Sequence, residues 1–266
     1  MICVLGDAHL DVVVSMAGVL AVDTDTPARV RLCVGGQGAN VAAWVVALGG
    51  QSRLIAAVAD DPAGSLVAGE LAGRGVDLVG PVAGGHTGVI VALSDGGSQR
   101  SMLTDRGVGP SLSAAAIDPE WLDGCSWLHV SGYSLVAEPA REAALAAASA
   151  ARARSARLSV DLSSAAAITA FGTARFRELI TGLRPDVVFA DRAEAELVGE
   201  LAGIDVIRKL GADGVIVGGR RYPAEATTPV DATGAGDAFA AGYLVGGVAL
   251  GLAAAARAVA TMGAMP

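Results

Sequence analysis

The segment 231–237, with the sequence Asp-Ala-Thr-Gly-Ala-Gly-Asp, combines small residues with a carboxylate at the start of a predicted helix. Uncovered N–H groups at a helix N-terminus favour an anion, because the unpaired donors and the helix dipole both attract negative charge. We expect Gly234, Ala235 and Gly236 to form this anion site. Asp237 would be the proton acceptor beside it, a combination that suits phosphoryl transfer to a hydroxyl. The alternative is that Asp237 only caps the helix.

A second glycine-rich segment, Gly-Gly-Gln-Gly-Ala-Asn at 35–40, lies between a strand-like run and a helical pattern that ends at Gly49. The paired Gly35 and Gly36 allow a ligand to approach the main chain, and Asn40 can bond hydroxyls as donor and as acceptor. We therefore expect all three residues to bind substrate.

Polar residues also gather near the N-terminus, where a buried strand at 2–5 is followed by Asp7, His9 and Asp11. We expect Asp11 and His9 to contact the substrate. Asp11 as a turn cap, and His9 as a polar bystander, are the alternatives.

The sequence resembles the ribokinase-like (PfkB) family of carbohydrate and nucleoside kinases over nearly its whole length. Three motifs carry the resemblance: Gly6-Asp7 with Asp11, Gly35-Gly36-x-Gly38-x-Asn40, and 231–237. The segments 191–196 and 209–214 are weaker matches to the Asn-x-x-Glu and nucleotide-loop elements of that family.

The resemblance implies ATP as the phosphoryl donor and Mg²⁺ as its partner, with Glu194 reaching the metal directly or through water. It also implies a monovalent cation, K⁺ being the candidate, held by Asp231 and the carbonyl of Thr233. The nucleotide would contact these residues: Asp191, Lys209, Gly211 and Gly214. Two positions depart from the family: Asp191 replaces the usual Asn, and Gly109 stands where Asn is usual.

Strand and helix signals alternate through the middle of the chain, which predicts a mostly parallel sheet between helices with ligands at the carboxyl ends of the strands. Short apolar runs at 53–58, 127–131 and 157–161 are predicted strands. We expect one three-layer α/β/α domain over 1–266, the ribokinase-like fold.

Two stretches break this alternation, because strand signals at roughly 12–34 and 87–105 have no helix between them. They predict a small β-sheet lid over the substrate, with a hairpin turn at 94–97. The resemblance adds that such a lid can also be the surface of a homodimer.

The composition limits the classes of partner that the chain is expected to bind, since 17% of the 266 residues are charged and the net charge is −8. This balance argues against nucleic acid and anionic membranes. The uncharged run 238–256 is long enough to suggest a membrane span, but its glycines favour two packed helices. No signal peptide precedes the first strand, so a cytoplasmic location is expected.

Other residues that could do chemistry receive simpler interpretations. His86 and His129 are expected in a loop and in the core, and Arg106 is expected to contact substrate or to pair with Asp105. The three cysteines are expected to be buried free thiols.

Two classes of nucleotide-binding enzyme are excluded because their motifs do not occur in the sequence. No Gly-Lys-Ser/Thr occurs, so a P-loop is absent, and neither Gly-x-Gly segment continues as a dinucleotide fingerprint. An ATP-dependent sugar kinase is the leading hypothesis. A nucleoside kinase for an adenosine- or pseudouridine-like acceptor is the first alternative, although few aromatic residues are available to stack a base. A catalytically weak sugar- or nucleotide-binding relative is the second.

Overall fold

The computed structural model describes residues 1–94 and 100–266, and of Arg100 only the backbone. The predicted hairpin turn at 94–97 lies largely outside the described residues. The central sheet is formed by these strands: β1 (Ile2–Leu5), β4 (Ser52–Ile55), β6 (Asp77–Val79), β10 (Trp127–Ser131), β11 (Arg157–Asp161), β12 (Val187–Ala190), β13 (Asp205–Lys209), β14 (Val215–Val217) and β15 (Arg220–Tyr222). Their order is β15-β14-β13-β12-β11-β10-β1-β4-β6. All neighbours from β13 to β6 are parallel, while β14 and β15 add an antiparallel edge.

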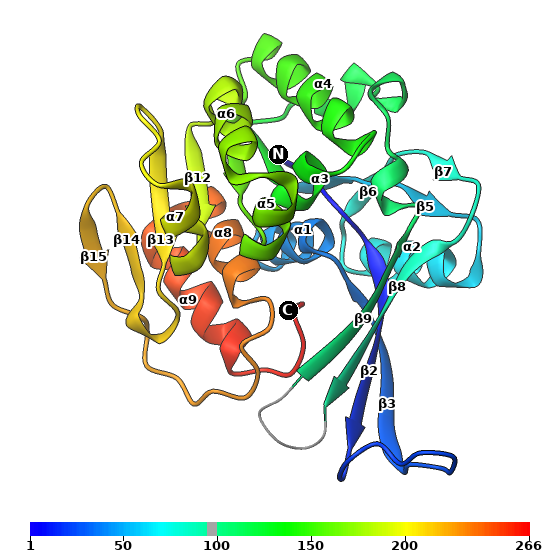
Figure 1. Ribbon diagram of the computed structural model, residues 1–266. Helices are drawn as coiled ribbons and strands as arrows, with labels where there is room; N and C mark the ends of the chain where they lie inside the picture. The colour runs from blue at the N-terminus through cyan, green and yellow to red at the C-terminus, as the bar shows by residue number, and fades with distance from the viewer. Residues whose placement is uncertain (95–99) are drawn as a thin grey trace.

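Helices cover both faces of this sheet (Figure 1). One layer contains α1 (Gln37–Ala47), α2 (Pro62–Gly73), α8 (Ala235–Gly246) and α9 (Val248–Val259). The other contains α3 (Gly132–Val136), α4 (Ala140–Ala153), α5 (Ala165–Phe171), α6 (Thr173–Leu183) and α7 (Arg192–Val198). The predicted three-layer α/β/α architecture is confirmed.

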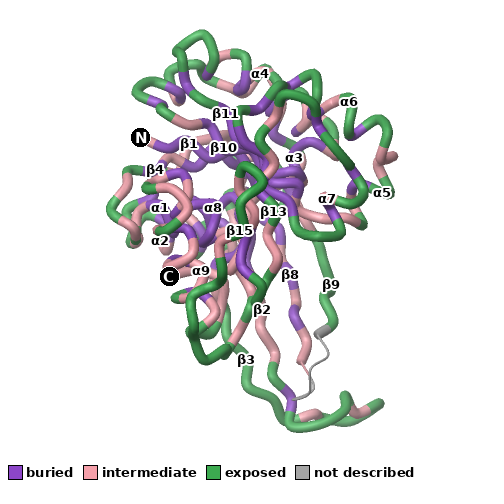
Figure 2. Tube along the Cα trace, turned by 90° about the vertical axis from the view of Figure 1, so that its left-hand side faces the viewer, coloured by how far each residue is buried: buried purple, intermediate pink, exposed green. Residues whose placement is uncertain are grey.

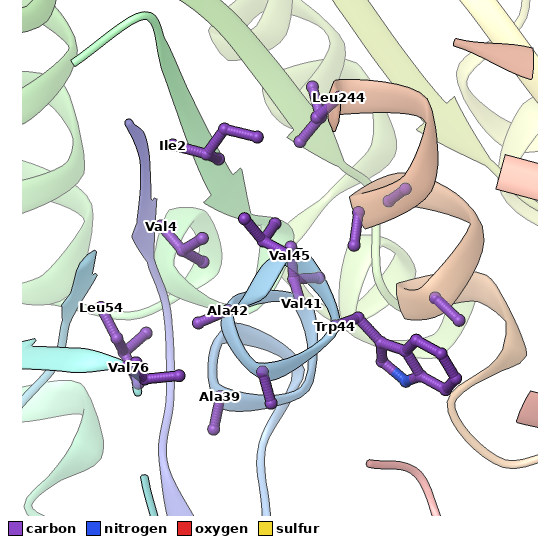
Figure 3. Close-up of a cluster of buried hydrophobic side chains, with 14 of the residues drawn as sticks. Ile2, Val4, Ala39, Val41, Ala42, Trp44, Val45, Leu54, Val76 and Leu244 are labelled. Atoms are coloured by element: carbon purple, nitrogen blue, oxygen red, sulfur yellow. The ribbon is translucent and has the colours of Figure 1, made fainter. Parts of the chain in front are cut away.

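The strands bury alternate side chains on opposite faces, as the two-residue repeat of a strand requires. In β1, Ile2 and Val4 pack in the cluster of α1 and α8, whereas Cys3 and Leu5 pack in the cluster of α4. Trp44, fully buried, fills the space between α1 and α8 (Figure 3).

The strands β2 (His9–Met16), β3 (Ala28–Gly35), β8 (Thr87–Ser94) and β9 (Arg100–Gly107) form a separate sheet in the order β3-β2-β8-β9, called the small sheet below. It projects from the body, and its far end is mostly exposed (Figure 2). β3 continues through Gly36 directly into α1.

The apolar run at 238–256 forms α8 and α9, which pack closely against each other. A Cβ on Gly242 would lie 2.7 Å from the Cα of Gly251, so the two glycines permit the contact. None of the helices described is both long and apolar enough to cross a membrane.

Two elements differ from expectation. The predicted strand at 53–58 is divided into β4 and the short β5 (Val58–Ala59), which pairs with β7 (Val82–Ala83) in a ribbon of its own. β13 was not predicted, because its sequence Asp-Val-Ile-Arg-Lys is too charged for a buried-strand pattern.

Candidate active site

A tight turn precedes α8, and its conformation requires glycine. Gly234 is the N-cap of α8 and has a left-handed φ of 76°. A Cβ at this position would lie 2.5 Å from the carbonyl oxygen of Ala264, which is main chain and cannot rotate away. Only glycine therefore satisfies both the backbone angle and the close approach.

The amides that follow this turn point along the start of α8. Ala235 N–H donates to the carbonyl of Ala232 at 3.3 Å, which closes the turn. The N–H groups of the first helical turn, which includes Gly236 and Asp237, have no acceptor within their own helix. Together with the helix dipole, they can hold an anion.

Asp231 braces the turn from behind. Its Oδ1 accepts hydrogen bonds from Thr233 N at 2.9 Å and Thr233 Oγ1 at 2.6 Å, and its Oδ2 accepts from Gly263 N at 3.1 Å. The indole of Trp44 donates to Ala264 O at 2.9 Å. The residues after α9 therefore fix the position of the turn.

Asp237 lies in the first turn of α8, half-buried, and faces the start of α1. Its Oδ2 accepts a hydrogen bond from Asn40 Nδ2 at 2.8 Å. Burial, opposed by this bond and reinforced by the nearby Asp161 carboxylate, raises the pKa of Asp237 to about 7. The two glycine-rich motifs, far apart in sequence, thus meet at one carboxylate.

The other motif brings main chain close to two acids. A Cβ on Gly35 would lie 2.3 Å from Asp11 Oδ2, and one on Gly36 would lie 2.4 Å from the carbonyl oxygen of Asp7. His9 Nε2 is 3.1 Å from Asp11 Oδ1. Gly35, Gly36, His9 and Asp11 are therefore together at the root of the small sheet.

A cavity of about 150 Å³ opens beside these residues. Its polar lining comprises Asp7, His9, Arg106, Tyr133 and Ser134. The pair between Arg106 and Asp105, one of the two roles predicted for Arg106, does not form. Instead, Arg106 Nη1 lies 3.1 Å from Asp7 Oδ2 and the guanidinium covers the ring of Tyr133 at 4.2 Å, while Asp105 contacts the exposed His86.

The carboxyl ends of β11 and β13, which have β12 between them, carry an ion pair that the sequence did not reveal. Lys209, the last residue of β13, places its Nζ 2.5 Å from Oδ2 of Asp161, the last residue of β11. Asp161 is fully buried. Its Oδ1 accepts from Ser163 N at 3.0 Å.

Asp191 and Glu194 form a capping box at the start of α7. Glu194 N donates to Asp191 Oδ1 and Asp191 N donates to Glu194 Oε2, both at 2.8 Å. Burial and the neighbouring Asp161 raise the pKa of Glu194 to about 7. These two residues thus have a structural role in the helix start, whatever else they bind.

The loop between β13 and β14 borders a second cavity, of about 100 Å³. Gly211 and Gly214 line it from the loop with left-handed φ angles of 61° and 88°, and Phe239 and Ala256 line it from α8 and α9. Lys209 and Gly236 reach the same cavity, so it connects with the turn before α8 at residues 231–236, called the anion turn below.

Among the residues described, no three His, Cys, Asp or Glu side chains are arranged to hold a metal ion. His129 is buried in the core, as predicted, and burial lowers its pKa to about 4. Any Mg²⁺ here would need phosphate or water oxygens beside a single carboxylate such as that of Glu194.

From sequence, Asp161 has two interpretations, a magnesium role or a strand end, and Arg106 has two, a substrate contact or a pair with Asp105. Tyr133 is not singled out by any sequence pattern. For Asp161 a signal existed, since parallel strands of one sheet end at the same edge and both Asp161 and Lys209 end such strands. For Arg106 and Tyr133 the contact depends on how the small sheet leans on the body, which no local pattern encodes.

Comparison with known proteins matches nearly the whole chain to one family of kinases. The family profile "pfkB family carbohydrate kinase" matches residues 1–265. A fructokinase from Escherichia coli is 30% identical over 275 residues, covering 94% of this chain and 85% of the relative. An ATP-dependent ribose-1-phosphate kinase from Halopiger xanaduensis is 32% identical, covering 79% of this chain and 72% of the relative. The crystal structure of adenosine kinase from Sinorhizobium meliloti superposes with a TM-score of 0.87 at 23% identity, over 100% of this chain and 95% of that one.

Proposed function

The chain belongs to the pfkB family of carbohydrate kinases, and on that premise we propose that it transfers the γ-phosphate of ATP to a hydroxyl of a small neutral sugar. As a carbohydrate kinase it is a phosphotransferase with an alcohol acceptor. The observation that carries the proposal is the 2.8 Å hydrogen bond from Asn40 to Asp237, which joins the carboxylate of the turn before α8 to the glycine-rich segment at 35–40.

In the proposed reaction, the acceptor hydroxyl lies against Asp11, Gly35, Gly36 and Asn40. Its oxygen attacks the γ-phosphorus, its proton passes to Asp237, and the bond from that phosphorus to the β–γ bridging oxygen breaks to release ADP. Because such transition states are loose, a carboxylate suffices as the base. The amides of Gly234, Ala235 and Gly236 would stabilise charge on the transferred phosphoryl group, with Ala235 N–H exchanging its 3.3 Å bond to the carbonyl of Ala232 for a phosphoryl oxygen.

Nucleotide and metal are assigned to the donor side. Gly211 and Gly214 border the cavity proposed for adenine, with Lys209 and Asp191 towards the phosphates. Mg²⁺ would neutralise phosphate charge, with Glu194 as its protein ligand, directly or through water. Asp231 and the Thr233 carbonyl would hold K⁺, which would stiffen the anion turn.

We assign the acceptor to the cavity of about 150 Å³ beside His9 and Arg106, called the acceptor cavity below. The charges around it favour an uncharged acceptor. Asp7, Asp11 and Asp237 are acidic, and the one arginine among the cavity's polar lining residues, Arg106, already pairs with Asp7. A phosphorylated or acidic sugar would meet this negative charge without a free cation to balance it. The fructokinases among the relatives support the same acceptor class.

A nucleoside acceptor is the second candidate, because the ring of Tyr133 borders the acceptor cavity and could stack a base. ADP release measured with panels of sugars and of nucleosides, with Mg²⁺ and K⁺ present, separates the two. We expect turnover with a neutral sugar. Turnover with nucleosides alone would favour the second candidate, and no acceptor-dependent turnover would indicate a binding protein.

The acid limb of the pH profile should report Asp237. Its pKa is raised to about 7, so the ionised base is depleted below that pH. We expect kcat/KM to fall about tenfold per pH unit below roughly 7 and to be level above it. Glu194 also has a pKa of about 7, so the limb should be measured again in Glu194→Gln, where it should persist. A limb centred near pH 4 would contradict the assignment.

Gly35→Ala should damage the acceptor side alone. The added methyl would lie 2.3 Å from Asp11 Oδ2 and must displace that carboxylate. A shift of about 1 Å in a positioning group costs on the order of 10²-fold, here in kcat/KM for the acceptor, while the KM for ATP should change little. Gly69→Ala, which adds the same methyl on α2 with no atom within 4 Å, is the matched control.

We also propose that the small sheet is a lid and the surface of a homodimer. Exposed apolar side chains mark it: Val30, Leu32, Met102 and Leu103, with Val19 and Val22 beyond. We expect a dimer by analytical ultracentrifugation, and Leu32→Asp should shift it towards monomer. A monomeric wild-type protein at micromolar concentration would contradict this.

A further inference from the structure

Lys209 is the only lysine of the chain, and its position is set by Asp161. The ammonium lies 2.5 Å from Asp161 Oδ2, and the two side chains are 16% and 1% exposed. The other carboxylate oxygen of Asp161 accepts the N–H of Ser163, so both oxygens are engaged. A lysine held at a fixed carboxylate gives up much of its rotamer freedom.

The same side chain runs beside the anion turn. A Cβ placed on Gly236 would lie 3.2 Å from Lys209 Nζ and 3.7 Å from its Cδ. Any anion that binds the amide of Gly236 would therefore be close to the ammonium. Close, desolvated charge-assisted hydrogen bonds of this kind are stronger than neutral ones.

We propose that Lys209 donates to the phosphoryl group being transferred, and that Asp161 is a positioning residue that keeps the ammonium at the anion turn and off the base Asp237. The inference rests on the proposed kinase function. An ammonium paired directly with Asp237 would stabilise its ionised form and make it a weaker base. Asp161 prevents this by pairing with the ammonium of Lys209 itself.

Electrostatics around Asp237 give this arrangement a measurable signature. The polar and charged groups that act on it are Asn40 from α1, Asp7 after β1, Asp161 from β11 and Lys209 from β13. Asp161 and Asp7 raise the pKa of Asp237, whereas Asn40 and Lys209 lower it. Removing Lys209 should therefore move the acid limb of kcat/KM to higher pH, and removing the charge of Asp161 should move it to lower pH.

The kinetic test uses Lys209→Met, Asp161→Asn and the double variant. We expect Lys209→Met to lower kcat by about 10²- to 10³-fold, as for loss of one preorganised donor to the transition state. Asp161→Asn should lower kcat less, and the two acid limbs should shift in opposite directions. The double variant leaves no unpaired buried charge and should be no slower than Lys209→Met. If Asp161→Asn does not fold, the double variant takes its place in the kinetic comparison.

Asp123→Asn is the matched control. It breaks the exposed Arg154–Asp123 ion pair of 2.8 Å, which takes no part in the site, and should leave kcat and the acid limb unchanged. A purely structural Lys209–Asp161 pair would lower thermal stability in the test variants while the acid limb stayed in place. That outcome would overturn the inference.

A second readout does not depend on turnover. Because the chain has a single lysine, protein labelled with ¹³Cε-lysine gives one lysine resonance by NMR, and Lys209→Met assigns it. We expect the resonance to shift with Mg²⁺ and a non-hydrolysable ATP analogue, but much less with Mg²⁺ and ADP, which lacks the γ-phosphate. Equal shifts with both nucleotides would refute the contact.

Failure of this inference is distinguishable from failure of the proposed function. If Asp237→Asn abolishes turnover while the acid limb ignores Lys209 and Asp161, the kinase assignment stands and the positioning pair does not. If Asp237→Asn keeps near-normal turnover, the proposed base itself is wrong.

Discussion

Asp237→Asn should lower kcat by on the order of 10²- to 10⁴-fold while nucleotide binding is retained. The substitution keeps the shape of the side chain and an oxygen that can accept from Asn40, but it removes the basic carboxylate. Loss of a general base affects the transition state and not the ground state, so the KM values should change little. Steady-state kinetics with the best acceptor, and calorimetry with an ATP analogue, measure the two effects separately.

The stability of the same variant provides the control. Since the pKa of Asp237 is raised from 3.8 to about 7, folding favours the protonated form, and stability is lost as pH rises from about 4 through 7. The asparagine variant should lack this loss and should melt at the same or a higher temperature than the wild type at pH 8. A variant that melts much lower would show that its inactivity comes from unfolding.

Gly234→Ala should be nearly as damaging, for a geometric reason. The left-handed φ of 76° disfavours a side chain, and the methyl would lie 2.5 Å from the main-chain oxygen of Ala264. The turn must therefore shift, and the amides of Ala235 and Gly236 shift with it. We expect kcat to fall by about 10²- to 10³-fold, comparable to the loss of one oxyanion donor.

Gly124→Ala separates strain from chemistry. Gly124 also has a left-handed φ, 72°, but its Cβ would meet no atom within 4 Å. Its alanine variant should lose about 1 kcal/mol of stability and keep normal turnover. Normal turnover in Gly234→Ala as well would show that the turn does not bind the phosphoryl group.

The two glycine-rich motifs of the candidate site could be found in the sequence because each is local. Gly234 and Gly36 occupy φ angles that favour glycine, and Asp237 follows at a fixed helical offset, so composition and order announce them. The fold class was predictable for a similar reason, since strands such as β10 and β11 have bounds set by short apolar runs.

What the sequence did not disclose depends on packing between elements. The pairing of Lys209 with Asp161 requires the strand order β13-β12-β11, and the contact of Arg106 with Asp7 requires the small sheet to lean on the body. β13 was missed because its charged residues hide a strand that is partly buried in the sheet. The dual position of Glu194, both cap and buried acid, likewise needs three dimensions.

The two ends of the small sheet differ in their surroundings. Its root carries His9, Asp11 and Gly35, which face the proposed acceptor, while its tip exposes Val19 and Val22 to solvent. A change at the tip is therefore separated from the chemistry by several residues of paired strand. Substitutions at the tip should therefore leave turnover and acceptor preference unchanged, whatever they do to assembly.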